Sequence, residues 1–173
     1  WPGAASPARP HARALAAACR PTLVLLGRSP EPAEEPEDLQ TAHSAAELKS
    51  TLFRQASARG RQPRPADLER EVQAILAARE IRQTLAELRG LGARAHYWPL
   101  DVRDAAAVEA VVRRARRELG PPRGLIHAAG VLADKRIEDK TPDQFDSVFD
   151  TKVQGLRHLL AALSQDDLHF MAF

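Results

Sequence analysis

Three short segments and one lysine hold the residue types that could bind a nucleotide or assist a proton transfer. The first segment, Gly27-Arg28-Ser29, directly follows an apolar run. A guanidinium such as that of Arg28 offers forked hydrogen-bond donors to a phosphate and can stack on adenine. In a dinucleotide-binding fold, arginine at this point suits a 2′-phosphate, whereas an acidic residue suits a 2′-hydroxyl. The alternative is a solvated arginine in a loop.

The second and third segments also follow apolar runs. Asp101-Val102 places a carboxylate where it could accept a hydrogen bond from an adenine amino group, or cap the helix that follows. Ala128-Ala129-Gly130 contains only small residues, which let the backbone approach a cofactor closely. A tight turn between a strand and a helix needs the same glycine, so neither segment specifies a ligand by itself.

Lys152 lies in the middle of a helical pattern, among the apolar residues Val148, Val153 and Leu156. A lysine on or beside the inward face of a helix either extends its ammonium group to solvent or has a function. These residues alone leave both interpretations open.

The elements that would position these residues alternate between strands and helices. Apolar runs predict strands over residues 22–26, 95–100, 124–127 and 168–173. Helical patterns predict helices over residues 12–19, 44–57, 65–90, 104–119 and about 142–163. This alternation is typical of βαβ units and a parallel sheet, which binds ligands beyond the carboxyl ends of its strands. The three segments are therefore expected to lie along one edge of the fold.

The longest helical pattern, residues 65–90, begins with a proline and ends with a glycine, as helices often do. Leu68 and Val72 share its apolar face, and this face drifts around the helix towards Leu85 and Leu88. Residues 30–36, which precede the helical region, are acidic and rich in proline and predict a surface loop.

Composition narrows the classes of function. The chain has 25 basic and 23 acidic residues, and the two kinds alternate, which does not favour a nucleic-acid partner. No apolar run reaches the roughly 18 residues of a membrane span, so no membrane partner is expected. The single cysteine, Cys19, excludes an internal disulfide and fits a reducing cytoplasm. Its alanine-rich surroundings predict that it is a small buried residue.

Together these segments resemble a known family. Residues 124–160, GLIHAAGVLADKRIEDKTPDQFDSVFDTKVQGLRHLL, closely resemble the ketoreductase domains of modular polyketide synthases, which belong to the short-chain dehydrogenase/reductase superfamily. Residues 75–104 look most like the polyunsaturated-fatty-acid synthase branch. The resemblance covers about residues 12–173. It implies an α/β fold with a Rossmann-like doubly wound parallel sheet, incomplete because its first strand and C-terminal part are missing.

The resemblance also implies a reaction, a cofactor and partners. Residues 1–173 would form a partial ketoreductase (NADP-binding Rossmann) domain, with a proline-rich and helical insertion at about 30–90. The complete domain would transfer a hydride from NADPH to a 3-oxoacyl thioester on an acyl carrier protein, beside other domains of a cytoplasmic multidomain synthase. A tyrosine would donate the proton, a serine would orient the carbonyl, and a lysine would favour ionisation of the tyrosine by its charge.

Each candidate residue takes a role from the resemblance. Lys152 would be the catalytic lysine. The cofactor would be bound at the 2′-phosphate by Arg28 and Ser29, at adenine by Asp101 and Val102, and at the nicotinamide ribose by Ala128, Ala129 and Gly130.

The sequence departs from the family pattern near both ends. The glycine-rich phosphate turn should fall at residues 2–6, where only Gly3 remains, and Pro7 and Pro10 remove amide donors from the following helix. Without the first strand, the strands at 22–26 and 124–127 would lose a shared neighbour. The serine and tyrosine should lie beyond residue 173, since the one tyrosine, Tyr97, precedes Asp101 on a strand.

Two functions therefore compete. The first is an oxidoreductase segment, inactive on its own, of a domain that reduces 3-oxoacyl groups, and Arg28 and Lys152 favour it. The second is a non-catalytic ketoreductase-like half-domain that supports neighbouring domains, and the altered glycine turn favours it. For the first function, Asp134 matches the second acid of a signature found with D-configured, usually (3R), products, and so predicts such a product.

Overall fold

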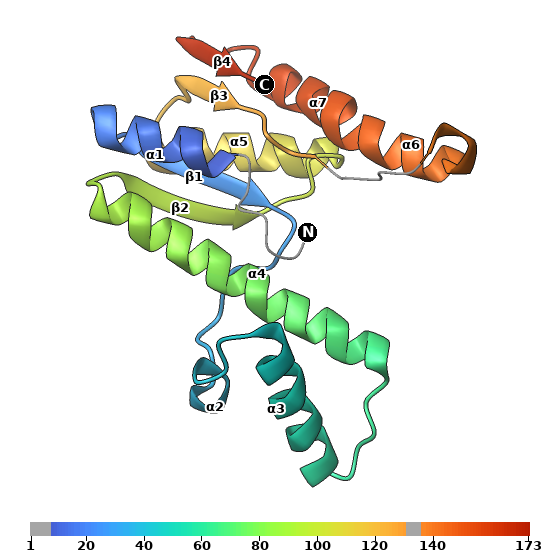
Figure 1. The fold of residues 1–173 in the computed structure, drawn as a ribbon. Helices are drawn as coiled ribbons and strands as arrows, with labels where there is room; N and C mark the ends of the chain where they lie inside the picture. The colour runs from blue at the N-terminus through green and yellow to red at the C-terminus, as the bar shows by residue number, and fades with distance from the viewer. Residues whose placement is uncertain (1–7, 131–135) are drawn as a thin grey trace.

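The computed structural model describes residues 8–130 and 136–173. Its strands are β1 (Thr22–Gly27), β2 (Arg94–Pro99), β3 (Gly124–Ile126) and β4 (Phe170–Ala172). The helices are α1 (Ala8–Cys19), α2 (Glu37–Gln40), α3 (Ala45–Ala58), α4 (Pro65–Gly90), α5 (Ala105–Leu119), α6 (Pro142–Phe149) and α7 (Gly155–Ala162), with a 3₁₀ turn, η1 (Ile137–Asp139), and a π-turn, η2 (Asp150–Gln154) (Figure 1). The paired strands are parallel, which confirms the predicted α/β class.

The strands form two separate two-stranded sheets, β1 with β2 and β3 with β4 (Figure 1). The carbonyls of Pro21 and Gly27, at the two ends of β1, accept hydrogen bonds from the β2 segment. Because alternate residues of a strand turn their backbone groups to opposite edges, the backbone groups of Val24 and Leu26 face away from β2. Among the described residues no strand lies between β1 and β3.

Helices cover both faces of this arrangement (Figure 1). α1 and α4 pack on one face of β1 and β2 through a cluster formed by Ala12, Ala16, Leu88, Ala93 and Ala95, with Leu23, Leu25 and Leu85 at its margin. α5 and α7 cover the other face, and their cluster includes residues from both sheets: Leu100, Val108, Val112, Leu125, Leu159 and Leu163, with Leu26 at its margin. Helices on both faces of parallel strands define a doubly wound architecture.

β1 is apolar from Leu23 to Leu26, as expected for a strand whose two faces are both covered by helices. Leu23 and Leu25 belong to the cluster under α1 and α4, whereas Leu26 belongs to the cluster under α5 and α7. Since alternate side chains of a strand point to opposite faces, a strand covered on both sides is a continuous apolar run. Its residues are nevertheless only half-buried, as expected for a strand with one unpaired edge.

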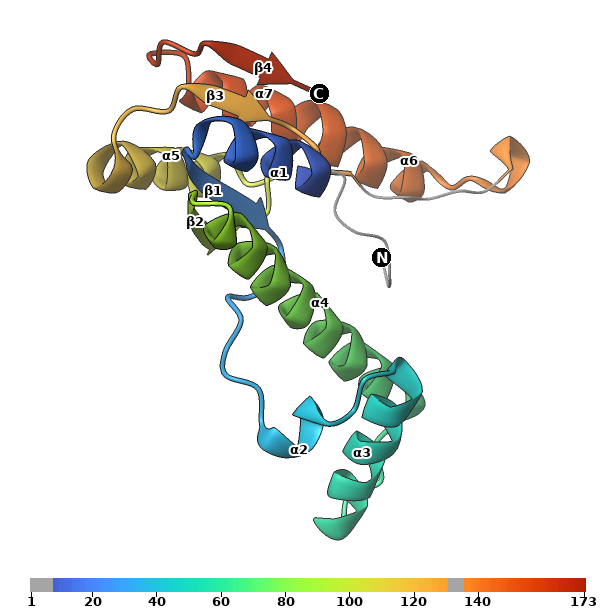
Figure 2. The ribbon, with the colours of Figure 1, turned by 60° about the vertical axis from the view of Figure 1, so that its left-hand side comes forward.

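α2, α3 and the first half of α4 project from the sheets as an arm (Figures 1 and 2). The arm has its own apolar core, formed by Leu39, Ala42, Leu48, Leu52, Leu68 and Val72. Further along α4, Leu85 and Leu88 pack against α1 instead. The apolar face of α4 drifts because its two halves pack against different partners. The arm lies within residues 30–90, and its origin as an insertion stays a prediction.

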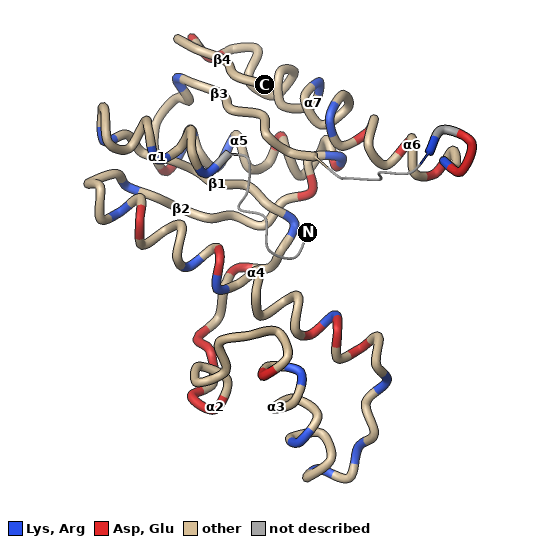
Figure 3. Tube along the Cα trace, viewed as in Figure 1, with Lys and Arg blue, Asp and Glu red and all other residues tan. Residues whose placement is uncertain are grey.

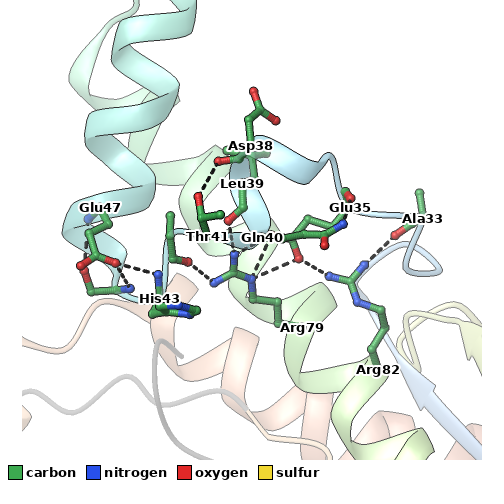
Figure 4. A network of polar contacts seen from close by, with 12 residues as sticks. Ala33, Glu35, Asp38, Leu39, Gln40, Thr41, His43, Glu47, Arg79 and Arg82 are labelled. Carbon is green, nitrogen blue, oxygen red and sulfur yellow. Dashed lines mark hydrogen bonds and ion pairs between the residues drawn. The ribbon is translucent and has the colours of Figure 1, made fainter.

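Arg79 and Arg82, in the second half of α4, attach the loop before α2 to this helix (Figure 4). The Arg79 guanidinium donates to both carboxylate oxygens of Glu35, at 2.6 to 3.1 Å, and to the carbonyls of Leu39 and Ala42 at 2.7 and 2.6 Å. Arg82 donates to the same carboxylate and to the Ala33 carbonyl, both at 2.6 Å. The Glu35 side chain is only 11% exposed, so its ion pair with Arg79 is largely shielded from solvent. Because Arg79 also donates to the Leu39 carbonyl, the pair holds α2 against α4.

Two expectations about local structure are wrong. Cys19 is exposed, because it lies in the last turn of α1 beyond the apolar cluster, where its thiol donates to the Leu15 carbonyl. The helix predicted over residues 142–163 is not regular, because the π-turn η2 separates α6 from α7. The four-residue helix α2 was not predicted.

Charged residues of both signs are mixed along most of the described chain (Figure 3). The end of α3 and the loop to α4 differ, because Arg54, Arg59, Arg61 and Arg64 lie there with no acidic residue between Glu47 and Asp67. Within the described ranges, no helix is both long and apolar enough to cross a membrane.

Candidate functional site

The carboxyl end of β1 carries Arg28 in a turn that one tyrosine fixes. The Tyr97 hydroxyl, from β2, donates to the Ser29 carbonyl at 2.7 Å. A Cβ at Gly27 would lie 2.8 Å from the same hydroxyl oxygen, so the ring needs a glycine beneath it. Burial raises the pKa of Tyr97, which keeps the phenol protonated as a donor. Arg28 itself is exposed and has no ion pair among the described residues, so its guanidinium is available to an anion.

The carboxyl end of β2 carries Asp101, which is paired with Arg103. Both carboxylate oxygens accept from the Arg103 guanidinium, at 2.6 to 3.1 Å, and one also accepts from its backbone N–H. The Arg103 side-chain hydrogen bonds lower the pKa of Asp101 to about 2, with a smaller contribution from the charge of Arg28. The α5 N-cap is Asp104, which accepts from the Ala107 N–H at 3.0 Å, so the capping role considered for Asp101 is wrong.

Val102 packs against α7. Its side chain fills the space left by Gly155, where a Cβ would lie 2.6 Å from a Val102 methyl group. Its carbonyl accepts a hydrogen bond from Nδ1 of His158 at 3.0 Å. Because both contacts are with the helix, Val102 fixes the end of β2 against α7, and its expected contact with adenine stays a prediction.

The carboxyl end of β3 meets Lys152. A Cβ at Gly130 would lie 3.3 Å from the Lys152 Cε atom, so the lysine side chain passes close to Gly130, the last residue of the small-residue turn Ala128–Gly130. Lys152 is exposed and projects from the π-turn η2. The His127 ring, just before the turn, is buried and contacts the Lys152 carbonyl at 3.0 Å. The structure therefore places Lys152 beside the Ala128–Gly130 segment, and the roles predicted for these residues stay predictions.

Electrostatic contacts connect the ends of β1 and β2 with η2. Arg28 and Arg103 both act on Asp101, and Arg103 is also influenced by Asp150, two residues before Lys152. The sequence alone assigns Tyr97 and Arg103 no role in this site, and it places His127 at the end of a strand as a packing residue. The pairing of Arg103 with Asp101 could have been predicted, because the two residues are only two positions apart. The hydrogen-bond partners of Tyr97 and His127 are distant in sequence and could not.

Gly3 and Asp134 lie outside the described residues. The described residues include no group of side chains suited to a metal ion.

A doubly wound α/β fold with polar and small residues at the carboxyl ends of parallel strands defines the Rossmann-like class. Within that class the chain belongs to the KR domain family, whose sequence model matches residues 3–173.

Two of the relatives that the chain matches are named as synthases. The chain is 44% identical over 88 residues to a polyunsaturated fatty acid synthase polypeptide of Thraustochytrium sp., a match that covers 50% of this chain and 3% of that protein. It is 42% identical over 87 residues to the polyketide synthase GfsA of Streptomyces halstedii, a match that covers 50% of this chain and 1% of that protein. The chain therefore spans only a small part of each relative.

Solved structures agree on the fold. An N-terminal ketoreductase from the macrolactin assembly line aligns with a TM-score of 0.65 at 24% identity, over 94% of this chain and 24% of that one. Carveol dehydrogenase from Mycobacterium avium in complex with NAD aligns with a TM-score of 0.56 at 18% identity, over 92% of this chain and 44% of that one. These alignments confirm the Rossmann-like architecture of short-chain dehydrogenases.

Proposed function

We propose that this chain is a segment of an NADPH-dependent 3-oxoacyl-thioester ketoreductase domain in a polyketide or polyunsaturated-fatty-acid synthase. The observation that carries the proposal is the placement of the Lys152 side chain beside Gly130, at the end of the small-residue turn Ala128–Gly130. A purely structural helix has no need for a lysine directed at a small-residue turn beyond a parallel strand. The substrate would be a 3-oxoacyl group on an acyl carrier protein, as the resemblance to synthase ketoreductase domains implies.

The residues present fit NADPH. Arg28, exposed and unpaired among the described residues, would bind the 2′-phosphate next to Ser29. Ala128 and Ala129 would lie along the nicotinamide ribose, where Gly130 has no Cβ to prevent a close approach. Asp101 and Val102 would face adenine, and Gly3 would belong to the phosphate turn. When bound, NADPH would supply the hydride.

Lys152 would act through its charge. An ammonium beside a phenol stabilises the phenolate and lowers the pKa of the phenol, which prepares it to exchange a proton with the carbonyl oxygen of the substrate. That phenol is not Tyr97, whose hydroxyl already donates to the Ser29 carbonyl. Asp134 would direct the hydride to give a (3R)-hydroxyacyl product, which chiral analysis of the product tests.

A second candidate function is a non-catalytic half-domain that supports neighbouring domains. The observation in its favour is the altered glycine turn, where only Gly3 remains and Pro7 and Pro10 remove amide donors. By itself, the 173-residue chain should not reduce a ketone, because its one tyrosine is engaged on β2 and general acid catalysis is worth roughly 10²–10⁴ in rate. The two candidates differ in whether the segment binds NADPH and whether Lys152 matters in the complete domain.

The test uses the ketoreductase domain that contains this segment. Arg28→Ala should weaken NADPH relative to NADH by about 1–3 kcal/mol, the scale of a charge-assisted hydrogen bond, and Lys152→Ala should abolish reduction of a 3-oxoacyl thioester. Arg94→Ala, which removes an exposed arginine at the amino end of β2, and Lys140→Ala are matched controls. Equal use of NADPH and NADH by the unaltered domain, or full activity of Lys152→Ala, would contradict the proposal.

A further inference from the structure

His127 connects the β3–β4 sheet to the turn that carries Lys152. The residue follows β3 and is buried, with 8% of its surface exposed. Its backbone N–H donates to the Ala172 carbonyl on β4 at 2.8 Å, which fixes it to the sheet. On the other side, its ring Nε2 lies 3.0 Å from the carbonyl oxygen of Lys152. Because a carbonyl oxygen only accepts, Nε2 must carry the hydrogen and donate it.

The backbone that receives this hydrogen bond is a π-turn. The Gly155 N–H donates to the Asp150 carbonyl, five residues back, in place of the usual four. Directly before Lys152, the buried Thr151 hydroxyl donates to the Ser147 carbonyl at 2.8 Å. Contacts on both sides of Lys152 therefore hold a turn whose own hydrogen-bond pattern is irregular.

We infer that His127 is a positioning residue for Lys152. Its Nε2–H···O hydrogen bond ties the π-turn to β3 and so fixes the point from which the lysine side chain reaches Gly130. The inference rests on the proposed role of Lys152 and assigns no proton transfer to His127.

Packing alone does not explain a histidine at this position. An apolar side chain would fill the same space without burying a polar atom, whereas a buried imidazole loses its hydration and needs a partner. In the described part of the chain no buried side-chain nitrogen or oxygen lacks a hydrogen bond, and the ring of His127 meets this requirement through the Lys152 carbonyl.

The first test determines the tautomer of His127 in the 173-residue chain from the nitrogen-15 signals of its ring. We expect the neutral ring to carry its hydrogen on Nε2. A neutral ring with its hydrogen on Nδ1 could not donate to the Lys152 carbonyl and would overturn the inference. This measurement does not depend on enzymatic activity.

The second test uses the ketoreductase domain that contains this segment. His127→Gln keeps an N–H donor, whereas His127→Met removes it, and His127→Leu is a second donor-free variant should the first not fold. Since a misplaced catalytic group costs on the order of 10- to 100-fold, we expect a loss of that size in kcat for His127→Met. The KM for NADPH should stay within about twofold, and His127→Gln should recover most of kcat. Equal kcat for the Gln and Met variants, or an unchanged kcat for Met, would overturn the inference.

A Lys152→Ala variant of the same domain separates the two proposals. If it stays active, the proposed function fails, whatever the tautomer of His127. If it is inactive while His127→Met keeps full kcat, only the positioning role of His127 fails.

Discussion

At the scale of single residues, Tyr97 shows how one side chain can shape a turn on the neighbouring strand, here the turn that carries Arg28. Its hydroxyl donates to the Ser29 carbonyl, and its ring lies over Gly27, so the backbone on both sides of Arg28 is held by a residue of the next strand. The direction of Arg28 therefore depends on β2 as much as on β1.

We predict that Tyr97 and Gly27 are energetically coupled. Gly27→Ala should destabilise the protein, because the new methyl group would stand 2.8 Å from the Tyr97 hydroxyl oxygen. In a Tyr97→Phe background, which itself costs about 0.5–1.5 kcal/mol for the lost hydrogen bond, the same substitution should cost less. Urea denaturation of the two single variants and the double variant measures the coupling. Strictly additive free energies of unfolding would contradict this contact.

The Asp101 carboxyl should titrate far below its usual range. The Arg103 hydrogen bonds lower its pKa to about 2, from an ordinary value of 3.8. Because the pKa of the folded protein lies below that of the unfolded chain, the stabilisation is complete above pH 3.8 and is lost as the pH falls towards 2. Carbon-13 NMR of the carboxyl should show this midpoint, and Arg103→Gln should move it upwards. An Arg113→Gln variant, which breaks a pair on α5 instead, should leave it in place.

The residues of the site that could be predicted from the sequence are those whose role depends on position along a strand. Arg28 and Gly130 follow apolar runs, and parallel strands end at a common edge, so their placement follows from local pattern. Tyr97 and His127 could not be found in this way. Each acts through a carbonyl that is distant in sequence, and a backbone acceptor leaves no mark on the residue types around it.

At the scale of elements, α4 is the helix that the local sequence predicts most clearly, and its bounds match the predicted residues 65–90. Its proline start and glycine end need only local chemistry. α2 and η2 could not be predicted, for different reasons. α2 has only four residues and depends on Arg79, far along the chain, to bind the carbonyls at its end. η2 differs from an ordinary helix by a single hydrogen-bond step, which hydrophobic periodicity does not resolve.

Glu35 should be important for the stability of the arm. We expect Glu35→Gln to lower the free energy of unfolding by about 1.5–3 kcal/mol, since two guanidinium groups would lose their charged partner. The Arg79 hydrogen bonds lower the pKa of Glu35 from 4.5, so its contribution is complete above that pH and is lost as the pH falls through the lowered value. The difference from the unaltered chain should therefore shrink in acid.

Chemical denaturation at neutral and acidic pH measures this difference. Glu34→Gln changes the net charge equally at an exposed neighbouring residue and is the matched control. A Glu34→Gln effect as large as that of Glu35→Gln would mean that the buried ion pair contributes nothing specific.

At the scale of the whole molecule, the two short sheets within residues 8–130 and 136–173 are joined by helices and not by strand pairing. Leu26 of β1 and Leu125 of β3 meet in the cluster under α5 and α7. Arg116 of α5 reinforces this layer through Asp166, which follows α7 and is 4% exposed, at 2.6 Å. An isolated two-stranded sheet is marginal in water, so the helical layer must provide most of the cohesion between the two halves.

Hydrogen exchange should reveal the edge of β1 that is not paired with β2. Within β1, the N–H groups of Leu23 and Leu25 face β2, whereas those of Val24 and Leu26 face the other edge. We expect Val24 and Leu26 to exchange at least about tenfold faster, which corresponds to ~1.4 kcal/mol of local opening. Residue-resolved NMR exchange measures each amide, and the N–H of Trp98, which faces β1, serves as a protected internal reference. Uniform protection along β1 would mean that another segment covers this edge.

The arm bears on the order in which the chain folds. Thr22 pairs with Arg94, and the entire arm lies between them in sequence. Contacts inside the arm join helices that follow one another directly, so they close small loops and form early. Once α2, α3 and α4 are packed, the segment between β1 and β2 is no longer a long flexible loop. Less conformational entropy is then lost when the two strands pair. The arm would thus act as a folding aid for the sheet from which it projects.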